Sequence, residues 1–558
     1  MYDIIIFGGG LAGMTIAHEV IKRGLKVLLV EKDTDFGGMV RSNIEHNSIP
    51  SEHSWRGYAP FYKNSFQIMK EIPSPAAASD STVFDNLGIP IDFHILYDDP
   101  KGYKPDLTIM DKLILIYLGM LYLESDERRH FYYSYKVEPY LKEHLSSSGY
   151  DWIINFTAGP GYGMHKSDVS MGHLLHFMII SRIHKERHTH THDNDIGTYV
   201  HRSDDRYDPW HVMNGPTSDV WIEPWVNYLQ GKGVDFMNNT ELVKLNYETN
   251  TISSAEVNNQ GSKKLLRATN YVVATNPYNT VNIFKNSNMN DLYNTFKLVT
   301  NNTTSKQISF RLGLDMDITY PVDNIAFVMN DSEFNITWYP QEKHWKTKPP
   351  IKSLWSGTII DFETPGKLYN KSAEFLTKEE LKEEIIHQLL RSKSFQRLIH
   401  DNNGFYLTKD DISYSEIWYE WEFSNGKQEQ VNKKWVNNTY NEQFRPSQGT
   451  DYTNMFLSGA HTKTSINIWS MEGAIESGKI TANLILDKLN ERPIRYYKHE
   501  DPWLILAIQR LDNILYNANL PNISILLLLL CAIMITRIVY YIYKNKKKLR
   551  ISALKKYI

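Results

Sequence analysis

The first 31 residues constrain the fold more strongly than any other part of this sequence. Ile4 to Phe7 is a short apolar run, as expected of a strand that is buried on both faces. A glycine-rich turn and a helical stretch from about Leu11 follow, and a second apolar run ends at Glu31. Two strands joined by a helix in this way predict an α/β protein built around a doubly wound parallel sheet.

Each glycine of the turn has a separate role in holding a dinucleotide. In G-x-G-x-x-G the first glycine allows a tight turn, the second lets the backbone approach a pyrophosphate, and the third lets the helix pack closely on the strand. The helix then directs its N-terminal N–H groups and the positive end of its dipole at the phosphates. An acid at the end of the second strand can accept hydrogen bonds from a ribose, or can simply be a solvated strand end. This Rossmann-type pattern makes candidate cofactor-binding residues of Gly8, Gly10, Leu11, Ala12, Gly13, Glu31 and Lys32.

The composition is that of an ordinary globular protein. Of the 558 residues, 42% are apolar and 22% are charged, which suits two closely packed domains or three small ones. The formal net charge of −3 gives no reason to expect nucleic acid as a partner. The only cysteine, Cys531, lies in an apolar stretch, so disulfides, thiolate catalysis and cysteine-ligated metal are excluded for the rest of the chain.

One segment is rich in histidine. His184 to His192 reads His-Lys-Glu-Arg-His-Thr-His-Thr-His, which could bind a metal ion. The spacing fits neither H-E-x-x-H nor a zinc finger, and a solvated loop is the better interpretation. We therefore predict no metal site.

A stretch near the C-terminus predicts a transmembrane helix over residues 522–543. Ile523 to Tyr543 is almost continuously apolar, and as a helix it would be roughly 30 Å long, enough to cross a bilayer core. Arg537 is the exception, but it lies near the basic end and can extend its charge to the interface. Residues 544–558 are expected to form a basic tail. A buried or surface-lying soluble helix is the alternative.

Residues 489–521 are expected to be a linker that contains an amphipathic helix, which could rest on the membrane surface or on the body of the protein. The first strand begins almost at Met1, which leaves no room for a signal peptide and favours a single-pass C-terminal anchor with a cytosolic body. The basic tail also prefers the cytosolic side, so the orientation stays open. The apolar stripe of the amphipathic helix consists of Leu504, Ala507, Ile508, Leu511 and Leu515.

Separate stretches of the chain predict two discontinuous domains. Residues 1–60, 213–280 and 452–488 carry the strand and turn patterns of one nucleotide-binding domain. Residues 61–212 and 281–451 mix apolar helices with strand-like runs and are expected to form an α+β substrate domain. Within the second part, Thr377-Lys-Glu-Glu380 predicts the start of a helix through a capping box.

Three motifs resemble those of the flavin-containing amine oxidase superfamily, which includes phytoene-type desaturases and protoporphyrinogen oxidase. The first is the glycine turn with Glu31. The second, Phe36-Gly-Gly-Met-Val-Arg-Ser42, is similar to the family's G-G-R-x-x-S. The third, Leu457-Ser-Gly-Ala460 followed by Met471-Glu-Gly-Ala-Ile-Glu-Ser-Gly478, is similar to the family's closing signature. The resemblance covers most of residues 1–488 and implies FAD as the cofactor.

The resemblance extends the set of expected cofactor contacts. Backbone at Gly459 and Ala460 would approach the flavin diphosphate or ribityl chain, and the helix that begins at Met471 and Glu472 would direct its dipole at the flavin ring. The family also implies that Val243 contacts the adenine end through its backbone. The second motif would add contacts from Gly37, Gly38, Arg41 and Ser42.

The sequence also departs from the family. Met39 stands where relatives usually carry arginine, so a phosphate contact there would have to come from elsewhere, with Arg41 as one candidate. Ser470 stands where amine oxidases place an aromatic ring, with Trp469 one residue earlier. An aromatic cage for an amine, and amine oxidation itself, are therefore in doubt.

Few residues are candidates for chemistry or substrate contact. Amine oxidases carry a strand lysine that holds a water near the flavin, which makes Lys306 the candidate catalytic residue, with a plain strand-start lysine as the alternative. His53, Arg56 and Trp469 are candidates for the substrate cavity. For His53 and Arg56 a hydrogen-bonded loop is an equal alternative.

These observations favour a membrane-anchored FAD oxidoreductase of desaturase type, which removes hydride from an apolar, isoprenoid-like or lipid-like substrate. Such a reaction needs few acids or bases, and an anchored body can take its substrate from the bilayer. Oxidation of a primary amine or polyamine with oxygen as acceptor is the second hypothesis. A flavin-binding membrane scaffold without turnover is the third.

Overall fold

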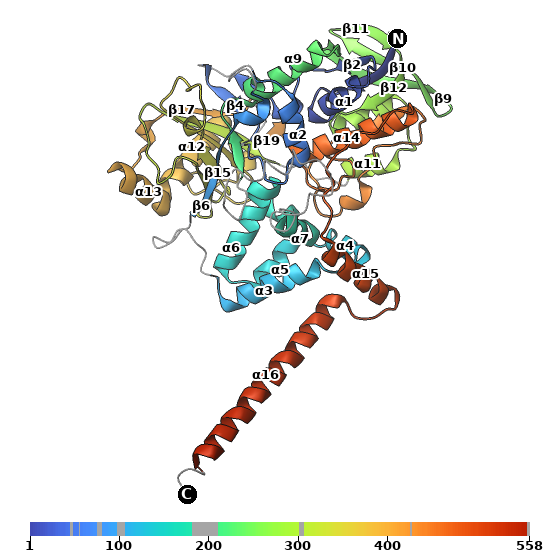
Figure 1. Cartoon of the computed structure of the whole chain (residues 1–558). Helices are drawn as coiled ribbons and strands as arrows, with labels where there is room; N and C mark the ends of the chain where they lie inside the picture. Colours follow the sequence, from blue (N-terminus) through green and yellow to red (C-terminus); the bar gives the residue numbers. More distant parts are fainter. Residues whose placement is uncertain are drawn as a thin grey trace.

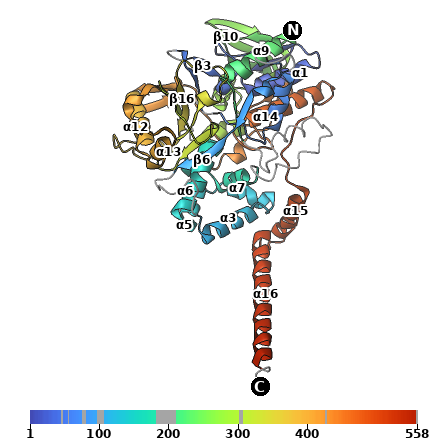
Figure 2. The ribbon, with the colours of Figure 1, turned by 60° about the vertical axis from the view of Figure 1, so that its left-hand side comes forward.

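The computed structural model describes residues 1–44, 48–54, 56–74, 81–96, 107–180, 210–300, 306–424 and 427–554. Two sheets lie side by side, a group of helices lies below them, and one long helix projects away from the body (Figures 1 and 2). The N-terminus lies at the end of the body opposite to this helix, and the C-terminus lies at the far end of the helix itself.

Five parallel strands form the sheet predicted from the first residues. β1 lies at the centre, between β12 and β2, and every pair in the sheet is parallel. The strands come from three distant stretches of the chain, as a discontinuous domain requires, while the limits of that domain remain a prediction. In spatial order the strands are β20 (Met455–Leu457), β12 (Ala268–Val273), β1 (Tyr2–Phe7), β2 (Val27–Val30) and β8 (Asp235–Met237).

Both faces of this sheet are covered, which explains the unbroken apolar run of β1. Ile4 and Ile6 pack in one core with helices α1 (Leu11–Ile21) and α14 (Met471–Lys488). Ile5 and Phe7 point to the opposite face, because successive side chains of a strand alternate. There they meet an antiparallel sheet of β9 (Thr240–Glu248), β10 (Thr251–Asn259) and β11 (Ser262–Leu266).

A six-stranded sheet forms the second half of the body. Its strands come from both stretches assigned to the substrate domain, since β6 pairs in parallel with β14 and the other pairs are antiparallel. Helices α12 (Lys378–Arg391) and α13 (Lys393–Asn403) pack against it (Figure 2). In order the strands are β17 (Ile412–Ile417), β13 (Ile308–Leu314), β16 (Ser353–Ile359), β15 (Thr337–Pro340), β14 (Ile325–Met329) and β6 (Asp92–Leu96).

The predicted capping box starts α12. Thr377 Oγ1 accepts a hydrogen bond from the Glu380 N–H (3.2 Å), and the Glu380 carboxylate accepts one from the Thr377 N–H (3.0 Å). Two N–H groups that the first helical turn leaves free are thereby bonded. The other connecting elements are α2 (Lys63–Glu71), α9 (Glu223–Gly231), α10 (Pro277–Asn286), α11 (Tyr293–Thr300), β3 (Ser42–Ile44), β4 (Pro50–Glu52), β5 (Leu87–Pro90), β7 (His211–Met213), β18 (Trp421–Ser424) and β19 (Lys427–Gln430).

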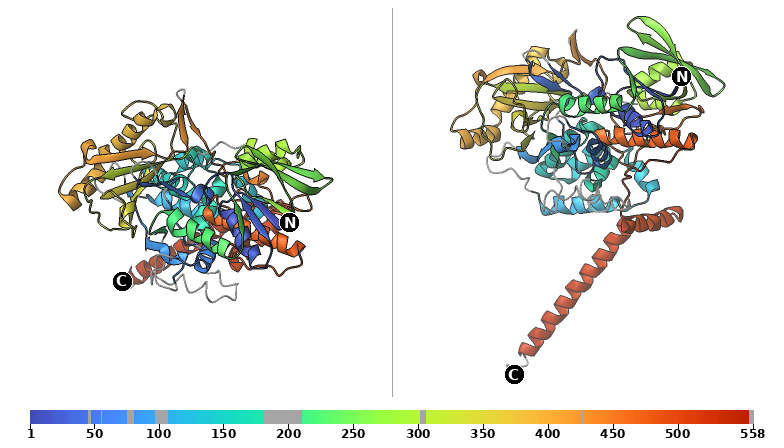
Figure 3. Two further views of the ribbon diagram at one scale, coloured as in Figure 1. Left: turned by 90° about the horizontal axis from the view of Figure 1, so that it is seen from above. Right: turned by 45° about the horizontal axis from the view of Figure 1, so that its top comes forward.

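Helices form the lower part of the body, beside the C-terminal segment (Figure 3). Within the predicted linker 489–521 the helix is α15. The last helix, α16, contains a stretch, Ile523–Asn545, that is long and apolar enough to cross a membrane, with a mean hydropathy of 2.5 and little burial. The predicted basic tail continues this helix as far as Leu554. The helices of this part are α3 (Ile109–Leu121), α4 (Asp126–Tyr132), α5 (Val137–His144), α6 (Ser147–Phe156), α7 (Met171–Ile180), α15 (Trp503–Asn517) and α16 (Ile523–Leu554).

Candidate active site

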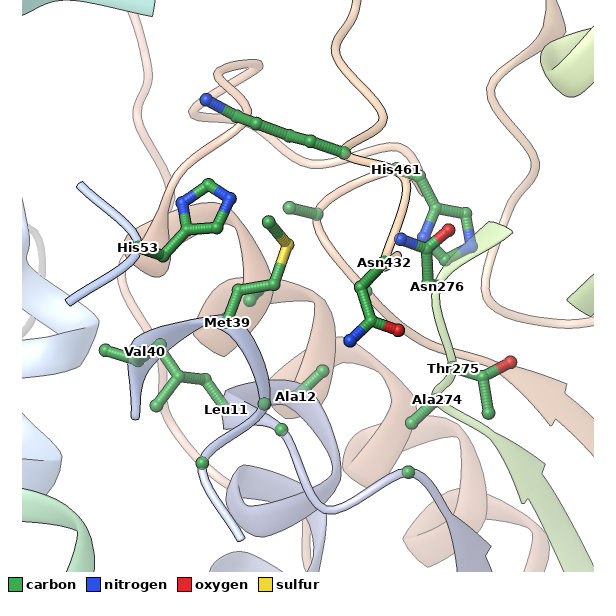
Figure 4. A pocket seen from close by; sticks show the side chains of 18 of the residues that line it. Leu11, Ala12, Met39, Val40, His53, Ala274, Thr275, Asn276, Asn432 and His461 are labelled. Atoms are coloured by element: carbon green, nitrogen blue, oxygen red, sulfur yellow. The ribbon is translucent and has the colours of Figure 1, made fainter. Parts of the chain in front are cut away.

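A cavity of about 540 Å³ opens at the carboxyl ends of β1, β2 and β12, where parallel α/β sheets bind their ligands. Figure 4 shows the loop after β1 and the loop after β12 on neighbouring sides of it, with Met39 and His53 above the start of α1. Most of the predicted site residues line this cavity: Gly8, Gly10, Leu11, Ala12, Glu31, Lys32, Gly37, Gly38, Arg41, His53, Arg56, Val243, Gly459, Ala460, Trp469 and Met471.

Two glycines of the turn, Gly8 and Gly13, lie in close contact with other backbone atoms, whereas Gly10 borders open space. A Cβ at Gly13 would lie 2.0 Å from the carbonyl oxygen of Gly8, so the third glycine is needed for the packing of α1 on β1. Gly8 has φ +112° and lies against the backbone of Ala274. At Gly10 the backbone is ordinary (φ −77°), and a Cβ would meet nothing nearer than the Gly38 Cα at 3.9 Å. A side chain at Gly10 would therefore extend into the cavity.

The start of α1 faces the cavity without a capping side chain. Gly10 is its N-cap residue and offers no side-chain oxygen to the first N–H groups of the helix. Leu11 and Ala12, the first helical residues, line the cavity. Uncapped N–H groups and the positive end of the helix dipole form a site for an anion such as a diphosphate.

Glu31 follows β2 and faces both the turn and the cavity. Its carboxylate accepts hydrogen bonds from the N–H groups of Gly9 (2.7 Å) and Asp33 (3.1 Å). Burial raises the pKa of Glu31, and the two backbone hydrogen bonds counteract that rise. The carboxylate is therefore held in place by the backbone and is not a solvated strand end.

The second motif packs directly on the first. Gly37 pairs with Gly10 in an isolated parallel β-bridge, and the Gly37 N–H donates to the carbonyl oxygen of Gly9 (2.8 Å). The Arg41 guanidinium donates to Asp33 (2.7 Å) and Glu420 (2.8 Å). Burial lowers the pKa of Arg41, but its interactions with Asp33 and Tyr419 outweigh burial and raise that pKa. Arg41 reaches the cavity wall with its charge already paired.

Val243 is the extra residue of a bulge in β9. The pairing with β10 changes from Leu242–Val257 to Lys244–Glu256. Val243, between the two pairs, therefore has no pairing partner on β10. Its carbonyl oxygen accepts a hydrogen bond from the Asn286 side chain (3.1 Å), and the residue lines the cavity. A bulge turns backbone away from the ladder, which suits contact with a ligand.

Three predicted cofactor residues lie outside the cavity lining. Gly13 lies under the turn. Ser42 bonds to Glu52 (3.0 Å) and to the N–H of Ser218 (3.0 Å). Glu472 is fully buried behind the start of α14, where its carboxylate accepts four hydrogen bonds from the backbone and side chains of Asn64 and Ser65. These residues shape the site without facing it.

Lys306, the predicted catalytic lysine, lies one residue away from the position that faces the cavity. Lys306 does not line the cavity; its side chain is 42% exposed, and its ammonium pairs with Glu374. Its neighbour Gln307 lines the cavity instead. Successive side chains of an extended segment point to opposite sides, so only one of the two can face inward. The position does not favour Lys306 as the catalytic lysine.

A different lysine, which the sequence analysis did not single out, lies in the cavity wall. The ammonium of Lys434 donates to the side-chain oxygen of Gln307 and to the carbonyl oxygen of Gly163 (3.3 Å). Burial, together with the charge of Arg56, lowers the pKa of Lys434 to about 7. Burial, together with the charges of Lys434 and Arg56, holds the pKa of His53 well below its usual value. Lys434, Arg56 and His53 thus form one cluster, here called the cationic cluster.

Three of the four carboxylates that line the cavity are bonded to groups outside this cluster. Glu31 is bonded to the glycine turn, Asp33 and Glu420 are bonded to Arg41, and Glu241 belongs to β9. Behind Arg56, Glu52 lies 3.7 Å from the guanidinium and bonds mainly to Thr217. Aromatic rings complete the lining, namely Tyr62, Tyr162, Trp210 and Trp469.

The residues present fit an FAD molecule. Gly10 leaves open space where a Cβ would point, α1 presents an uncapped N-terminus, and Glu31 is held where a ribose would lie. The cavity runs from the bulge of β9 to the aromatic residues beside the cationic cluster. Among the described residues no group of three or more His, Cys, Asp or Glu is arranged to hold a metal ion, and His184–His192 lies outside the described residues.

Comparison with known proteins gives two family matches. The model of the family described as "NAD(P)-binding Rossmann-like domain" matches residues 6–72. The model described as "Flavin containing amine oxidoreductase" matches residues 428–486, which include Lys434 and the third motif. A comparison with curated protein sequences gave no match.

Solved structures share the fold at low sequence identity. Cyclohexylamine oxidase from Brevibacterium oxydans IH-35A aligns with a TM-score of 0.54 and 15% identity, over 88% of this chain and 100% of the other. A putative protoporphyrinogen oxidase from Exiguobacterium sp. 255-15 gives 0.54 and 14%, over 87% and 98%. An oxidoreductase from Methanosarcina mazei gives 0.55 and 12%, over 88% and 100%. At these identities the likeness establishes the fold.

Proposed function

We propose that this chain, which matches the model of the flavin-containing amine oxidoreductases over residues 428–486, is an FAD-dependent oxidoreductase that oxidises an apolar substrate that is uncharged or acidic. FAD, when bound, supplies an acceptor for a hydride. The observation that carries the proposal is the cationic cluster. Lys434 and Arg56 line the cavity together with aromatic residues, and the lining carboxylates Asp33 and Glu420 are paired with Arg41. The carboxylate next to Arg56, that of Glu52, does not line the cavity. An ammonium substrate would meet the charge of Arg56 there, and that of Lys434 in its protonated form, whereas an apolar or acidic substrate would meet no like charge.

The proposed reaction is a desaturation. The substrate loses a hydride from one carbon and a proton from its neighbour as a carbon–carbon double bond forms. Neutral Lys434 Nζ accepts the proton and becomes an ammonium, because about half of the amine is neutral near pH 7 and Gln307 and Gly163 fix its position. His53 stays neutral and uncharged beside it. The surrounding aromatic rings exclude water and hold an apolar chain.

Oxidation of an amine is the second candidate. Cyclohexylamine oxidase shares the fold, and Tyr62, Tyr162, Trp210 and Trp469 give the cavity the aromatic lining that an amine site would need. An amine would have to enter the cationic cluster in its neutral form. This requirement makes it the weaker candidate.

Anaerobic loss of the blue absorbance of the flavin distinguishes the two candidates. The detergent-solubilised full chain is mixed with fractions of a membrane lipid extract and, separately, with cyclohexylamine and putrescine. We expect a lipid fraction to bleach the flavin, and mass spectrometry then identifies the molecule. Bleaching by the amines alone would overturn the proposal and establish the second candidate.

A membrane anchor completes the proposal. Ile523–Asn545 would be about 35 Å long as a helix, compared with a bilayer core of about 30 Å. An anchored body would take an apolar substrate directly from the bilayer. The cytosolic side remains our prediction for the body, and protease accessibility of the body in sealed vesicles of known orientation tests it.

A further inference from the structure

Helix α15 buries polar residues and exposes large apolar ones, which is the reverse of the usual arrangement in a helix that faces water. Its polar residues Gln509 and Asp512 are buried: Gln509 donates to the Tyr122 carbonyl oxygen (3.2 Å), and Asp512 accepts from the Ser125 N–H (2.8 Å). Its large apolar residues lie on the outside, although an amphipathic helix in water places them inside. The exposed ones are Trp503, Leu504, Leu511 and Ile514.

Helix α3 also exposes large apolar residues, although it buries Leu118 and Leu121 on its other side. Asp111 is fully buried and accepts hydrogen bonds from the N–H (2.8 Å) and hydroxyl (2.7 Å) of Ser146. Met110, Leu113 and Ile116 follow one another at a spacing of three positions and therefore share one side of the helix. The exposed large apolar residues of α3 are Ile109, Met110, Leu113 and Ile116.

Both helices flank the start of α16. The Ile523 N–H donates to Asp512 of α15 (2.7 Å), and the Ser524 hydroxyl donates to the Met120 carbonyl oxygen of α3 (2.9 Å). Figures 1 and 3 show α3 and α15 along the side of the body from which α16 leaves. Hydrogen bonds thus tie both helices to the first turn of the candidate transmembrane helix.

We propose that the exposed apolar faces of α3 and α15, here called the flanking surface, lie in the interfacial layer of the bilayer that α16 crosses. The flanking surface consists of Ile109, Met110, Leu113, Ile116, Trp503, Leu504, Leu511 and Ile514. This inference rests on the membrane anchor of the proposed function and goes beyond it. The body itself contacts the bilayer surface through α3 and α15, in addition to being attached through α16.

Charge and composition favour a lipid surface as the occupant. Trp503, at the first position of α15, is the ring type that membrane–water interfaces favour. Lys112 and Arg510 are exposed beside the apolar residues, where they can meet lipid phosphates. With α16 crossing a bilayer, the surface beside its first turn faces lipid before it can face a second copy of the chain.

Thiol labelling of the full chain in vesicles tests the flanking surface. Leu113→Cys and Ile514→Cys are made in a Cys531→Ser background and labelled with a polarity-sensitive fluorophore. Leu265→Cys on β11 is the matched control, because Leu265 is 58% exposed, close to the 53% of Leu113. The native chain labelled at Cys531 reports on α16 itself, since this thiol is free and exposed.

Quenching by nitroxide-bearing phosphatidylcholine is compared with quenching by aqueous iodide in phosphatidylcholine–phosphatidylserine vesicles. For the labels at 113 and 514 we expect lipid quenching at least about twofold stronger than at 265, and weaker iodide quenching, as for residues in an interface. Equal behaviour at all three positions overturns the inference.

The label at Cys531 allows the proposed lipid contact of the flanking surface to be tested separately from the proposed transmembrane anchor. Lipid quenching at 531 without quenching at 113 and 514 leaves the anchor intact and refutes the seating of the body. Quenching at 113 and 514 without quenching at 531 supports the flanking surface and refutes the transmembrane span. Protection from iodide without lipid quenching would mean that a second copy covers the surface, which also overturns the inference.

Discussion

At the scale of single residues, the glycines of the first turn differ in what they tolerate. Gly13 and Gly8 are in close contact with backbone, so a side chain there disturbs the fold itself. Gly10 is the exception, because its backbone conformation suits any residue and the space beyond it is the cavity. A substitution at Gly10 can therefore separate loss of cofactor from loss of structure.

We expect Gly10→Val to fold and to lose FAD. A valine would occupy the space that the pyrophosphate needs, and the affinity for FAD should fall at least about tenfold, or about 1.4 kcal/mol. Flavin absorbance per protein after gel filtration measures the loss, and circular dichroism checks the fold. Gly231→Val is the control, since a Cβ at Gly231 meets nothing within 4 Å and the residue lies outside the cavity. Full yellow colour in Gly10→Val would contradict the assignment.

The lysine pair 306 and 434 allows a matched test of the cationic cluster. Because the pKa of Lys434 is lowered to about 7, its neutral form accumulates above that pH, and the rate of substrate oxidation should rise through pH 7 and then level off. Lys434→Met should lower kcat about 100-fold or more and remove this rise. The measurement is the pH profile of flavin bleaching by its substrate.

Lys306→Met is the control for that experiment. Lys306 is partly exposed and paired with Glu374, so its removal should leave the profile unchanged. Both variants should keep their flavin. A profile that changes in Lys306→Met and not in Lys434→Met would restore the lysine that the family resemblance indicated.

At the scale of elements, one buried carboxylate near the start of α14 joins this helix to α2. Glu472 bonds to the N–H and side chain of both Asn64 and Ser65, at distances of 2.6–2.9 Å, and thereby joins α14 to α2. Met471, one residue earlier, lines the cavity. Glu472 therefore sets where the N-terminus of α14 points.

Glu472→Ala should destabilise the body strongly. Four buried donors lose their acceptor, and we expect the free energy of unfolding to fall by about 3 kcal/mol or more. Thermal unfolding of the detergent-solubilised protein, followed by release of flavin fluorescence, measures the change. Glu491→Ala is the matched control, because Glu491 is exposed. An unchanged melting temperature in Glu472→Ala would show that α14 is held by other contacts.

At the scale of the whole molecule, the body and α16 can be separated at one place. Asp512 and Gln509 bond α15 to the body, so a cut that keeps α15 leaves those contacts in place. A cut before residue 500 would instead expose Tyr122 and Ser125, which α15 covers.

Removal of residues 522–558 should therefore give a yellow protein that alkaline carbonate washes from membranes, whereas the full chain stays in the membrane pellet. The flanking surface still binds lipid weakly, so sedimentation with vesicles should persist at low salt. The readouts are flavin absorbance and protein in pellet and supernatant. A truncated chain that resists carbonate would show that a segment other than α16 spans the membrane.

The sequence predicted those parts of the site that depend on neighbouring residues. The turn of Gly8, Gly10 and Gly13, the placement of Glu31 and the capping box of Thr377 are local, and each lies where its spacing indicated. Glu472 was predicted to contact the cofactor because of its position at a helix start. Only the packing of α2 against α14 shows that its carboxylate points away from the cavity.

Of the cationic cluster, His53 and Arg56 were predicted as cavity residues, but Lys434 could not have been predicted in the same way. Lys434, Gln307 and Gly163 come from three distant segments and meet only after folding. A strand-like run that begins near Lys306 indicates that either Lys306 or Gln307 faces inward. Which of the two does so depends on how the strand pairs with its partner strands. A lysine before Trp435 carries no local signal of burial.

By itself, the sequence determined the α/β architecture, the dinucleotide turn and the apolar C-terminal helix, because each follows from the order of residues within about 30 positions. Only the tertiary structure decided which lysine is buried, where a bulge exposes Val243 and how α3 and α15 flank α16. The physical reason is desolvation: whether a charged or apolar side chain meets water depends on segments that approach it from elsewhere in the chain.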